Sequence, residues 1–475
     1  MMHKINKDKI KSSLVTATGT LWRASKSPDE ALGELFADVQ KQRIYVDGKT
    51  FVDLLPRRRL KQIYQEYSLA KQDPLFDLRE FVARNFYEPP IQNSRPAFES
   101  DPNMTVSDHI TVLWSHLERR NRRDRGSLIA LPYTYIVPGG RFNEQFYWDG
   151  YFIMLGLAAD GRWDMIEGMI KNYAYLMRKF GFIPTANRTY FLSRSQPPFF
   201  SQMVRLLAQH KGDSVLIEYL PYLLIEYRFW MKGKSKLAKQ EHRAIARVVD
   251  MENGELLNRY FDNKTTPRPE SLNEDIEAAE HAIEREPGRL YLHLRAGAES
   301  GWDFSSRWFA DANDIKTIHT ADIIPVDLNC LLYQLETTIA KSYKILKQPL
   351  LVRKFQKLAD RRATSINTHC WDETVNFYMD YNFHQAHTTE RFSLAGVFPL
   401  YAEIASTDQA AAVAEVIQKH FLKDGGLITT LVESSQQWDA PNGWAPLHWI
   451  VIQGLRNYGY YTLANDIKHR WIATN

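Results

Sequence analysis

Cysteine and long apolar runs are scarce in this chain of 475 residues. The two cysteines, Cys330 and Cys370, lie far apart, and one pair cannot form the dense disulfide framework of a small secreted domain. No segment approaches the ~20 consecutive apolar residues that a transmembrane helix needs. The charged start, Met1 to Ile10, is not followed by the apolar segment and cleavage site of a signal peptide. These absences predict a soluble, cytoplasmic protein without a membrane partner.

Strong net charge and metal-binding motifs are also lacking. The net charge is only +4, and no basic stretch with interleaved aromatic residues stands out, which argues against nucleic acid as a partner. His384 and His387 stand three residues apart, and His109 and His116 seven apart, but neither pair has a third ligand nearby. We therefore expect no metal site and no nucleic-acid partner.

Aromatic residues, by contrast, are abundant, at 13% of the chain, and tryptophan is followed by aspartate five times. Three of these Trp-Asp pairs, at Trp148, Trp302 and Trp438, stand in dense strings of glycine, aromatic and polar residues. The pairs at Trp163 and Trp371 stand at the start of a helix and before a turn, where we expect caps or core anchors. The pairs show no ~40-residue period, which excludes a propeller.

The composition of the three strings fits a site for a neutral sugar. Tryptophan and tyrosine offer flat apolar platforms for the C–H faces of a sugar ring. The planar guanidinium group of arginine offers several N–H donors to the hydroxyl groups of the sugar. A carboxylate accepts hydrogen bonds from those hydroxyl groups and performs acid–base chemistry. The residues themselves leave Asp149, Asp303 and Asp439 nearly equal as catalytic candidates.

The hydrophobic pattern is mainly helical. We expect an amphipathic helix from Asp29 to Ile44, a helix capped by Ser107 that faces the core through Ile110 and Trp114, and a helix that ends at Gly181. Further helices are expected over 201–210, 214–231, 325–346, 350–367, 392–405, 408–422, 445–457 and 463–470, and a strand over 376–381.

These elements suggest two parts. Residues 1–97 are expected to form an N-terminal arm of helical and extended segments, and residues 98–475 a toroid of helix pairs whose loops converge on a pocket. The charged segment Asp262 to Gly288 is expected to be an exposed insertion, with Glu274 to Glu284 forming a solvated helix face. Arg268 and Glu270 stand where that insertion can fold over the pocket.

Two long motifs give the chain a specific resemblance. The string Pro138-Gly-Gly-Arg-Phe142, followed by Trp148-Asp149, and the string Gln437-Trp-Asp-Ala-Pro-Asn-Gly-Trp-Ala-Pro446 match the two signatures of the α,α-trehalases. The similarity begins near Tyr45 and includes Ser193-Arg-Ser-Gln-Pro-Pro198 and Ala298 to Trp308. The chain therefore resembles the inverting trehalases with an (α/α)6 toroid, and among them the bacterial cytoplasmic form.

The resemblance implies hydrolysis of α,α-trehalose to two glucose molecules, with inversion, no cofactor and a monomeric enzyme. An inverting glycosidase uses one carboxylic acid to protonate the leaving oxygen and a second carboxylate, roughly 6.5–9.5 Å away, to activate water. Asp303 matches the general acid of the family, and we expect burial beside Trp302 to raise its pKa. The residues expected to hold the two glucose rings are Arg141, Trp148, Asp149, Arg194, Ser195, Gln196, Arg268, Glu270 and Gly301.

The chain departs from the family pattern in two places. Thr185 stands where the family commonly has a sugar-binding asparagine, so one hydrogen bond to the sugar is expected to shift or vanish. The family continues beyond the helix that ends near Arg470 with a segment that carries the catalytic base and the last helix of the toroid. Because this sequence ends at Asn475, we expect that base and that part of the barrel to be missing.

These departures leave three functions open. The first is a trehalase with reduced turnover, in which Glu433 or Asp439 is weighed as a substitute base. The second is a remnant that binds trehalose without cleaving it. The third is another exo-acting α-glucosidase on the same barrel, which would have to account for both trehalase signatures.

Overall fold

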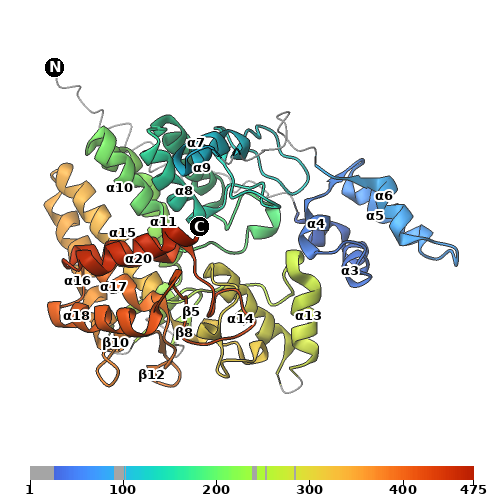
Figure 1. Ribbon diagram of the computed structural model, residues 1–475. Coiled ribbons are helices and arrows are strands. Elements are labelled where there is room, and N and C mark those ends of the chain that lie inside the picture. The colour runs from blue at the N-terminus through green and yellow to red at the C-terminus, as the bar shows by residue number, and fades with distance from the viewer. Residues whose placement is uncertain (1–25, 90–100, 102, 238–242, 252–253, 283–284) are drawn as a thin grey trace. The chain divides into compact units, whose positions relative to one another are not determined.

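The structure is a computed structural model that describes residues 26–89, 101, 103–237, 243–251, 254–282 and 285–475 (Figure 1). The chain forms two compact units. Unit 1 comprises Met1–Ser195 and Phe200–Phe229, and unit 2 comprises Gln196–Phe199 and Trp230–Asn475. This division does not bear on the boundary at residue 97, which stays a prediction.

Unit 1 is mainly helical, with two short antiparallel strand pairs, β1 with β2 and β3 with β4. Its elements are α2 (Pro28–Leu32), α3 (Glu34–Lys41), α4 (Gly48–Asp53), β1 (Leu55–Pro56), α5 (Leu60–Ala70), α6 (Leu78–Asn85), β2 (Phe86–Tyr87), α7 (Val106–Leu117), β3 (Glu118–Arg119), β4 (Tyr135–Ile136), α8 (Tyr147–Ala159), α9 (Trp163–Phe180), α10 (Phe200–Lys211) and α11 (Ser214–Trp230), whose last residue belongs to unit 2.

Helices α8, α9 and α10 pack against one another and form the core of unit 1. Helix α9 ends as predicted at Gly181, which adopts a left-handed φ of 83° and donates its N–H to Met177 O at 2.8 Å. Gly150 on α8 permits a close approach, because a Cβ there would lie 2.0 Å from the hydroxyl oxygen of Tyr173 on α9. Position 150 must therefore be glycine for the first turn of α8, which carries Trp148 and Asp149, to pack this closely against α9.

The N-terminal helices of unit 1 differ from the expected pattern in two respects. The helix expected from Asp29 to Ile44 is divided at Gly33, where φ is 49°, into α2 and α3. Helix α7 forms as expected, but its cap is Thr105, and Ile110 is 40% exposed while Trp114 is buried. The expectation that Ile110 faces the core is wrong, because the buried side of this short helix is narrower than its apolar stripe.

Unit 2 contains the longest helices, with short strands in the loops between them. Its elements are α12 (Lys234–Leu237), β5 (Ala244–Ile245), β6 (Val248–Asp250), β7 (Leu256–Asn258), α13 (Leu272–Glu280), α14 (Pro287–Glu299), β8 (Ile323–Ile324), α15 (Val326–Ile345), α16 (Pro349–His369), β9 (Trp371–Asp372), β10 (Phe377–Tyr378), β11 (Tyr381–Asn382), β12 (His387–Thr388), α17 (Phe398–Tyr401), α18 (Thr407–Val416), β13 (Leu422–Lys423), β14 (Gly426–Leu427), α19 (Ala445–Asn457) and α20 (Tyr461–Thr474).

Helices α15 and α16 form an antiparallel hairpin that is fastened by charge as well as by apolar packing. Arg362 on α16 donates to Glu336 on α15 at 2.9 and 3.1 Å, and both side chains are buried. Proline starts α16 at Pro349, where its missing N–H costs no hydrogen bond. The helices expected over 325–346 and 350–367 are thus confirmed within a few residues.

The remaining helices of unit 2 are confirmed except for one. Helix α18 continues as a π-helix from Ile417 to Phe421, and α19 and α20 cover the two expected C-terminal helices. Residues 392–405 form a 3-10 turn at Leu394–Val397 followed by the single turn of α17, so the continuous helix expected there is wrong. The strand expected over 376–381 is confirmed only as the short β10 and the start of β11.

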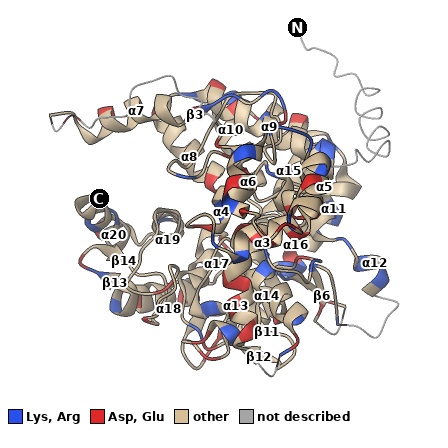
Figure 2. Cartoon of the chain, turned by 90° about the vertical axis from the view of Figure 1, so that its right-hand side faces the viewer, with Lys and Arg blue, Asp and Glu red and all other residues tan. Residues whose placement is uncertain are grey.

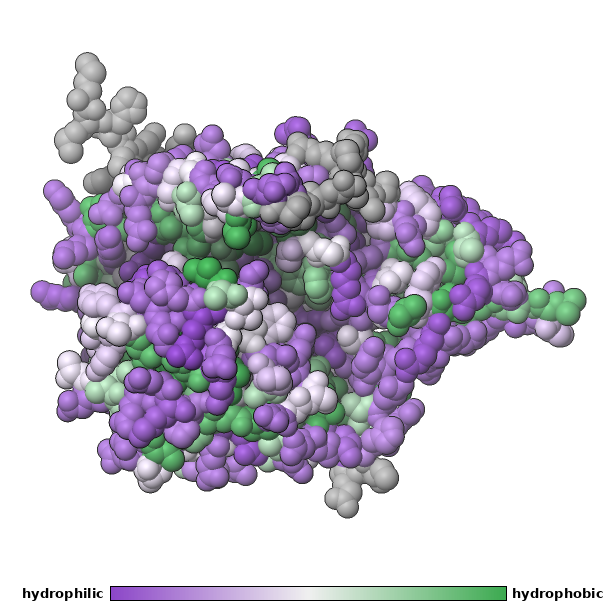
Figure 3. Space-filling model, viewed as in Figure 1, coloured by the Kyte–Doolittle hydropathy of each residue, from purple (hydrophilic) through white to green (hydrophobic). Residues whose placement is uncertain are grey.

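The described surface is mixed in character. Lys and Arg are interspersed with Asp and Glu along most of the described elements (Figure 2), and Figure 3 shows apolar residues in small groups among hydrophilic ones on the face drawn. No described helix is long and apolar enough to cross a lipid bilayer. The described residues also contain no group of three or more His, Cys, Asp or Glu side chains placed to hold a metal ion.

A buried carboxyl group on α11 makes the stability of unit 1 fall as pH rises toward about 8. Glu226 accepts a short hydrogen bond from the hydroxyl of Tyr147, while its Oε2 has no partner among the described residues. Burial raises the pKa of Glu226 to about 8. The protonated acid is therefore the form that the folded state favours.

We predict that the free energy of unfolding falls as pH rises from the unfolded pKa, about 4.3, to the folded value of about 8, because the folded state then holds a proton that the unfolded state has lost. The loss is about 1.4 kcal/mol per pH unit. Glu226→Gln should reduce this slope in urea titrations at pH 6, 7 and 8. Glu218→Gln, an exposed position on the same helix, should keep it; equal slopes in Glu226→Gln and the unsubstituted chain would contradict the assignment.

Candidate active site

The glycine pair of the first string shapes the loop that carries Arg141. Gly139 and Gly140 have φ values of 103° and 57°, which only glycine adopts without strain, and Phe142 donates its N–H back to Gly139 O at 3.0 Å. Arg141 is therefore presented at the tip of a tight turn. Its side chain is 60% exposed and lies 3.8 Å from Asp47.

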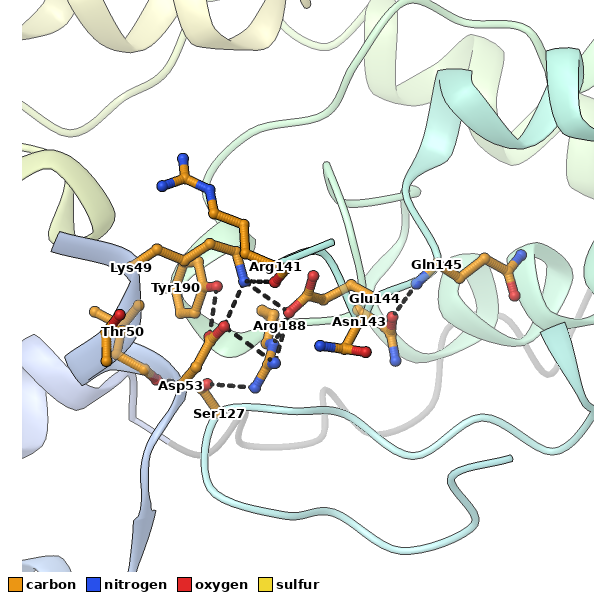
Figure 4. Close-up of polar contacts among 12 residues, drawn as sticks. Lys49, Thr50, Asp53, Ser127, Arg141, Asn143, Glu144, Gln145, Arg188 and Tyr190 are labelled. Atoms are coloured by element: carbon orange, nitrogen blue, oxygen red, sulfur yellow. Dashed lines mark hydrogen bonds and ion pairs between the residues drawn. The ribbon is translucent and has the colours of Figure 1, made fainter. Parts of the chain in front are cut away.

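Directly behind Arg141 lies a buried charge network, which Figure 4 shows with the Arg141 guanidinium pointing away from it. Glu144 is fully buried and accepts hydrogen bonds from Arg188 Nε at 2.6 Å and Lys49 Nζ at 3.0 Å. Burial opposes ionisation, but the two cations outweigh it and lower the pKa of Glu144. Lys49 Nζ also donates to Arg141 O at 3.4 Å, so the network reaches the loop itself.

Asp53 joins the same network from the end of α4. It forms ion pairs with Arg188, at 3.3 Å, and with Lys49, and it accepts from Tyr190 Oη at 2.9 Å. A cavity of about 310 Å³ opens beside these residues and is lined in part by Arg141 and Arg188. The N-terminal segment of unit 1 thus supports one predicted sugar-binding arginine, a role that nothing in its own residues indicated.

The other predicted residues of unit 1 lie on α8 and on the loop before α10. Trp148 is buried and Asp149 half-buried in the first turn of α8. Arg194 and Ser195 are buried, and the Arg194 guanidinium lies 5.1 Å from the Phe191 ring. The hydroxyl of Thr185 donates to Ser195 O at 2.9 Å. Thr185 therefore holds the backbone of the loop that carries Arg194 and Ser195.

In unit 2, Arg268 is fixed by a carboxylate that was expected on a solvated face. Asp275 on α13 is buried and accepts from Arg268 N at 2.7 Å, from Nε at 3.0 and 3.2 Å and from Nη2 at 2.6 Å. Although burial opposes it, Asp275 raises the pKa of Arg268, with smaller contributions from Glu270 and Asp303. The expectation of a solvated Asp275 is wrong, because a buried guanidinium requires a paired carboxylate.

Arg268, Glu270 and Asp303 thus form one electrostatic cluster. Glu270 is half-buried on the 3-10 turn Pro269–Ser271, directly after Arg268. The Arg268 guanidinium lies 4.9 Å from the Phe304 ring, next to Asp303. Gln196, the remaining predicted residue of the Arg-Ser-Gln motif, is buried and belongs to unit 2.

Asp303 lies on the loop after α14, where the chain turns through Gly301 with a φ of 75°. Trp302 is fully buried and stacks on Trp438, with ring centroids 5.4 Å apart, and Trp438 stacks on Trp444 at 4.4 Å. Asp303 itself is half-buried. The loop thus presents a carboxyl group with partial solvent access beside an arginine and a stack of indole rings, which suits proton transfer to a sugar oxygen.

Asp439, one of the three aspartates that the sequence left nearly equal, has a different environment. It is fully buried and accepts five hydrogen bonds, from Ser305 Oγ, Ser306 N, Ser306 Oγ, Thr430 Oγ1 and Ser434 Oγ, at 2.6–2.9 Å. Glu433 is exposed. The remaining Trp-Asp pairs lie at the start of α9 and in β9, where Asp372 accepts from Thr374, as expected for structural positions.

Comparison with known proteins agrees with these motifs. A family model described as Trehalase matches residues 42–475. The chain is 45% identical over 448 residues to the periplasmic trehalase of Salmonella agona (strain SL483), covering 94% of this chain and 78% of the relative. The neutral trehalase Nth1 from Saccharomyces cerevisiae is a structural neighbour with a TM-score of 0.61 and 29% identity, covering 72% of this chain and 66% of that one.

A more distant structure bears on the fold alone. The GH63 mannosylglycerate hydrolase from Thermus thermophilus, in complex with glucose, has a TM-score of 0.50 and 16% identity and covers 78% of this chain and 91% of that one. Together with the helical structure and the trehalase neighbour, this confirms the predicted fold class, mainly α with the (α/α)6 toroid. The absence of the last part of the barrel stays a prediction.

The predicted cytoplasmic location is wrong. The curated relatives that match 94% of this chain are named periplasmic trehalases. The prediction relied on the low cysteine count, but Cys330 and Cys370 are buried free thiols that pack as small apolar side chains. Such residues fit either compartment, so they carry no information on location. The prediction also relied on the lack of a signal-peptide pattern near the N-terminus, and the first 25 residues lie outside the described part of the chain.

We predict that Glu144→Gln lowers the free energy of unfolding by about 3–5 kcal/mol, because Asp53 alone then faces the two buried cations Arg188 and Lys49, which leaves one positive charge uncompensated. Glu167→Gln is the matched control, since Glu167 pairs with Lys171 and Lys211 near the surface, where such a pair contributes about 0–1 kcal/mol. Urea unfolding followed by tryptophan fluorescence measures both. Similar losses in the two variants would contradict the structural role of Glu144.

Proposed function

The chain belongs to the trehalase family, and from this we propose that it hydrolyses α,α-trehalose to two glucose molecules by an inverting acid–base mechanism. Membership makes it an enzyme, a glycoside hydrolase of the α,α-trehalase type. The observation that carries the proposal is Asp303, a half-buried carboxyl group on a loop beside Arg268 and Trp302. Family membership favours hydrolysis over a remnant that only binds trehalose.

In this mechanism Asp303 is the general acid that protonates the oxygen between the two glucose rings. Arg268 contributes positive charge next to the leaving oxygen and donates to sugar hydroxyls, and Glu270 accepts from them. Because the pairing with Asp275 fixes its guanidinium, Arg268 requires little rearrangement when the sugar binds. Asp303, once it has lost its proton, is stabilised by the same arginine.

The remaining predicted residues supply the rest of the sugar contacts in the proposal. Arg141 and Arg194 donate to hydroxyls, and Trp148 provides an apolar platform. Asp149, Ser195, Gln196 and Gly301 complete the set expected to surround the two rings. The partner is a small sugar; a monomer, a periplasmic location and the absence of a cofactor are part of the proposal.

Asp439 and Glu433 are the two carboxylates weighed for the role of activating water. Asp439 does not suit this role, because five donors already occupy its oxygens and leave no lone pair to accept a proton from water. Glu433 is exposed and retains accessible oxygens, so it is the better of the two substitutes that the sequence suggested. Loss of hydrolysis in Glu433→Ala, with azide restoring turnover by attacking the anomeric carbon in place of water to give β-glucosyl azide and one glucose, would identify Glu433 as the base.

We predict that Asp303→Asn lowers kcat for trehalose by about 10²–10⁴-fold, because an amide cannot donate the proton that the leaving oxygen needs. Glucose release from purified protein measures the effect. Asp311→Asn, an exposed aspartate eight residues further along the chain, should retain activity. Equal activity in Asp303→Asn and the unsubstituted chain would exclude Asp303 as the general acid.

A second prediction concerns the arginine beside it. Asp275→Asn should lower kcat/KM roughly 10–100-fold, because a hydrogen bond to a charged group contributes about 1.5–3 kcal/mol and Arg268 then loses its fixed orientation. Glu277→Gln, an exposed position on the same helix, is the control and should have little effect. An unchanged kcat/KM in Asp275→Asn would show that Arg268 does not act through this pair.

A further inference from the structure

Three consecutive residues of the second signature bond in register to the loop that carries Asp303. The side-chain amide of Gln437 donates to Asp303 O, and Trp438 N donates to Phe304 O at 3.1 Å. Asp439 then accepts from the hydroxyl of Ser305 and from both the N–H and the hydroxyl of Ser306, each at 2.8 Å. Residues 437–439 and residues 303–306, which lie far apart in the sequence, are thus joined by hydrogen bonds along both segments.

The carboxylate of Asp439 is the strongest point of this contact. An ionised carboxylate has about four lone-pair sites, and Asp439 meets five donors with no exposed surface. Two of the donors, Thr430 Oγ1 and Ser434 Oγ, come from its own segment and hold it from the other side. Asp439 therefore joins two loops through oxygens that no substrate can reach.

The segment that carries Asp439 is itself fixed. Trp444 Nε1 donates to Gln437 O at 2.9 Å, and Asn442 Nδ2 donates to the same oxygen at 3.2 Å. Trp438 is held between the rings of Trp302 and Trp444. The contact thus ties the loop of Asp303 to a segment that is itself restrained by hydrogen bonds and ring stacking.

We propose that Gln437 and Asp439 position the general acid, with Asp439 as the residue that sets the orientation of the Asp303 carboxyl group without touching the sugar. This inference rests on the proposed function, since it takes Asp303 as the proton donor. A donor must stay within hydrogen-bond reach of the oxygen it protonates, and a displacement of ~1 Å can cost ~10²-fold in rate. Asp439 meets this requirement by bonding residues two and three positions after Asp303.

The test compares two substrates that differ in their need for a proton donor. Asp439→Asn replaces one acceptor oxygen by an NH2 group that faces donors, so the loop should shift while the sugar-binding residues stay in place. We expect kcat for trehalose to fall roughly 10–10²-fold with little change in KM. Hydrolysis of α-glucosyl fluoride should fall much less, because fluoride leaves with little help from an acid.

Glu336→Gln is the matched control, because Glu336 is an equally buried carboxylate of unit 2 that pairs with Arg362 on the α15–α16 hairpin. It should lower Tm but affect both substrates alike. If Asp439→Asn likewise slows both substrates to the same extent, or slows neither, the positioning role is overturned. A selective loss on trehalose supports it.

Hydrogen exchange separates this inference from the proposed function. If the unsubstituted chain hydrolyses neither substrate, the proposed function fails, and exchange still tests the contact itself. Faster exchange of the Ser306 amide in Asp439→Asn, with no change in α15, would support the anchoring of the loop. Unchanged exchange at Ser306 would overturn it.

Discussion

The pairing of buried guanidinium groups with carboxylates recurs in both units and constrains much of the described structure. In unit 1, Arg188 forms ion pairs with Glu144 and Asp53. In unit 2, Arg307 is fully buried and bonds to both Asp327 and Asp380 at 2.6–2.9 Å. Further buried arginine–carboxylate pairs among the described residues of unit 2 include Arg247 with Glu299, Arg268 with Asp275, Arg295 with Asp262, and Arg362 with Glu336. Removing one member of such a pair leaves an uncompensated charge, so these contacts fix where loops can lie.

Some of these carboxylates hold residues of the candidate site, although the carboxylates themselves are not among its predicted residues. Asp275 bonds directly to the guanidinium of Arg268, whereas Glu144 reaches Arg141 only through Lys49, which donates to the Arg141 backbone oxygen. Asp303 is held differently, through Asp439 and neutral donors. The candidate site therefore combines Arg268, which a buried carboxylate fixes, with the half-buried carboxyl group of Asp303.

The sequence predicted the helices best where apolar periodicity and local start or stop signals determine where a helix begins and ends. Helix α9 has an apolar stripe and a glycine stop, and α15, α16 and α19 were likewise placed within a few residues. Helix α14 and the burial of Asp275 were missed, because the segment from Asp262 to Gly288 looks solvated when its charges are counted one by one. Its charge is neutralised by tertiary pairing, between Arg268 and Asp275 and between Arg295 and Asp262, which no periodicity reveals.

The same limit applies to the site. Motif matching predicted Asp303 and the arginines as site residues, but composition could not separate Asp149, Asp303 and Asp439. Their environments differ in ways only the fold defines: Asp439 is saturated by serine and threonine hydroxyls, whereas Asp303 is half-buried. Location was misjudged because buried thiols and the absence of a disulfide framework do not report on a compartment.

The most direct test of the account is the anomeric form of the glucose first released from trehalose, followed by proton NMR before mutarotation. Inversion at the attacked carbon gives one β-glucose, and the leaving sugar is α-glucose, so we predict equal initial amounts of the two anomers. Initial release of α-glucose alone would indicate retention, and no release of glucose would contradict the proposed hydrolysis itself.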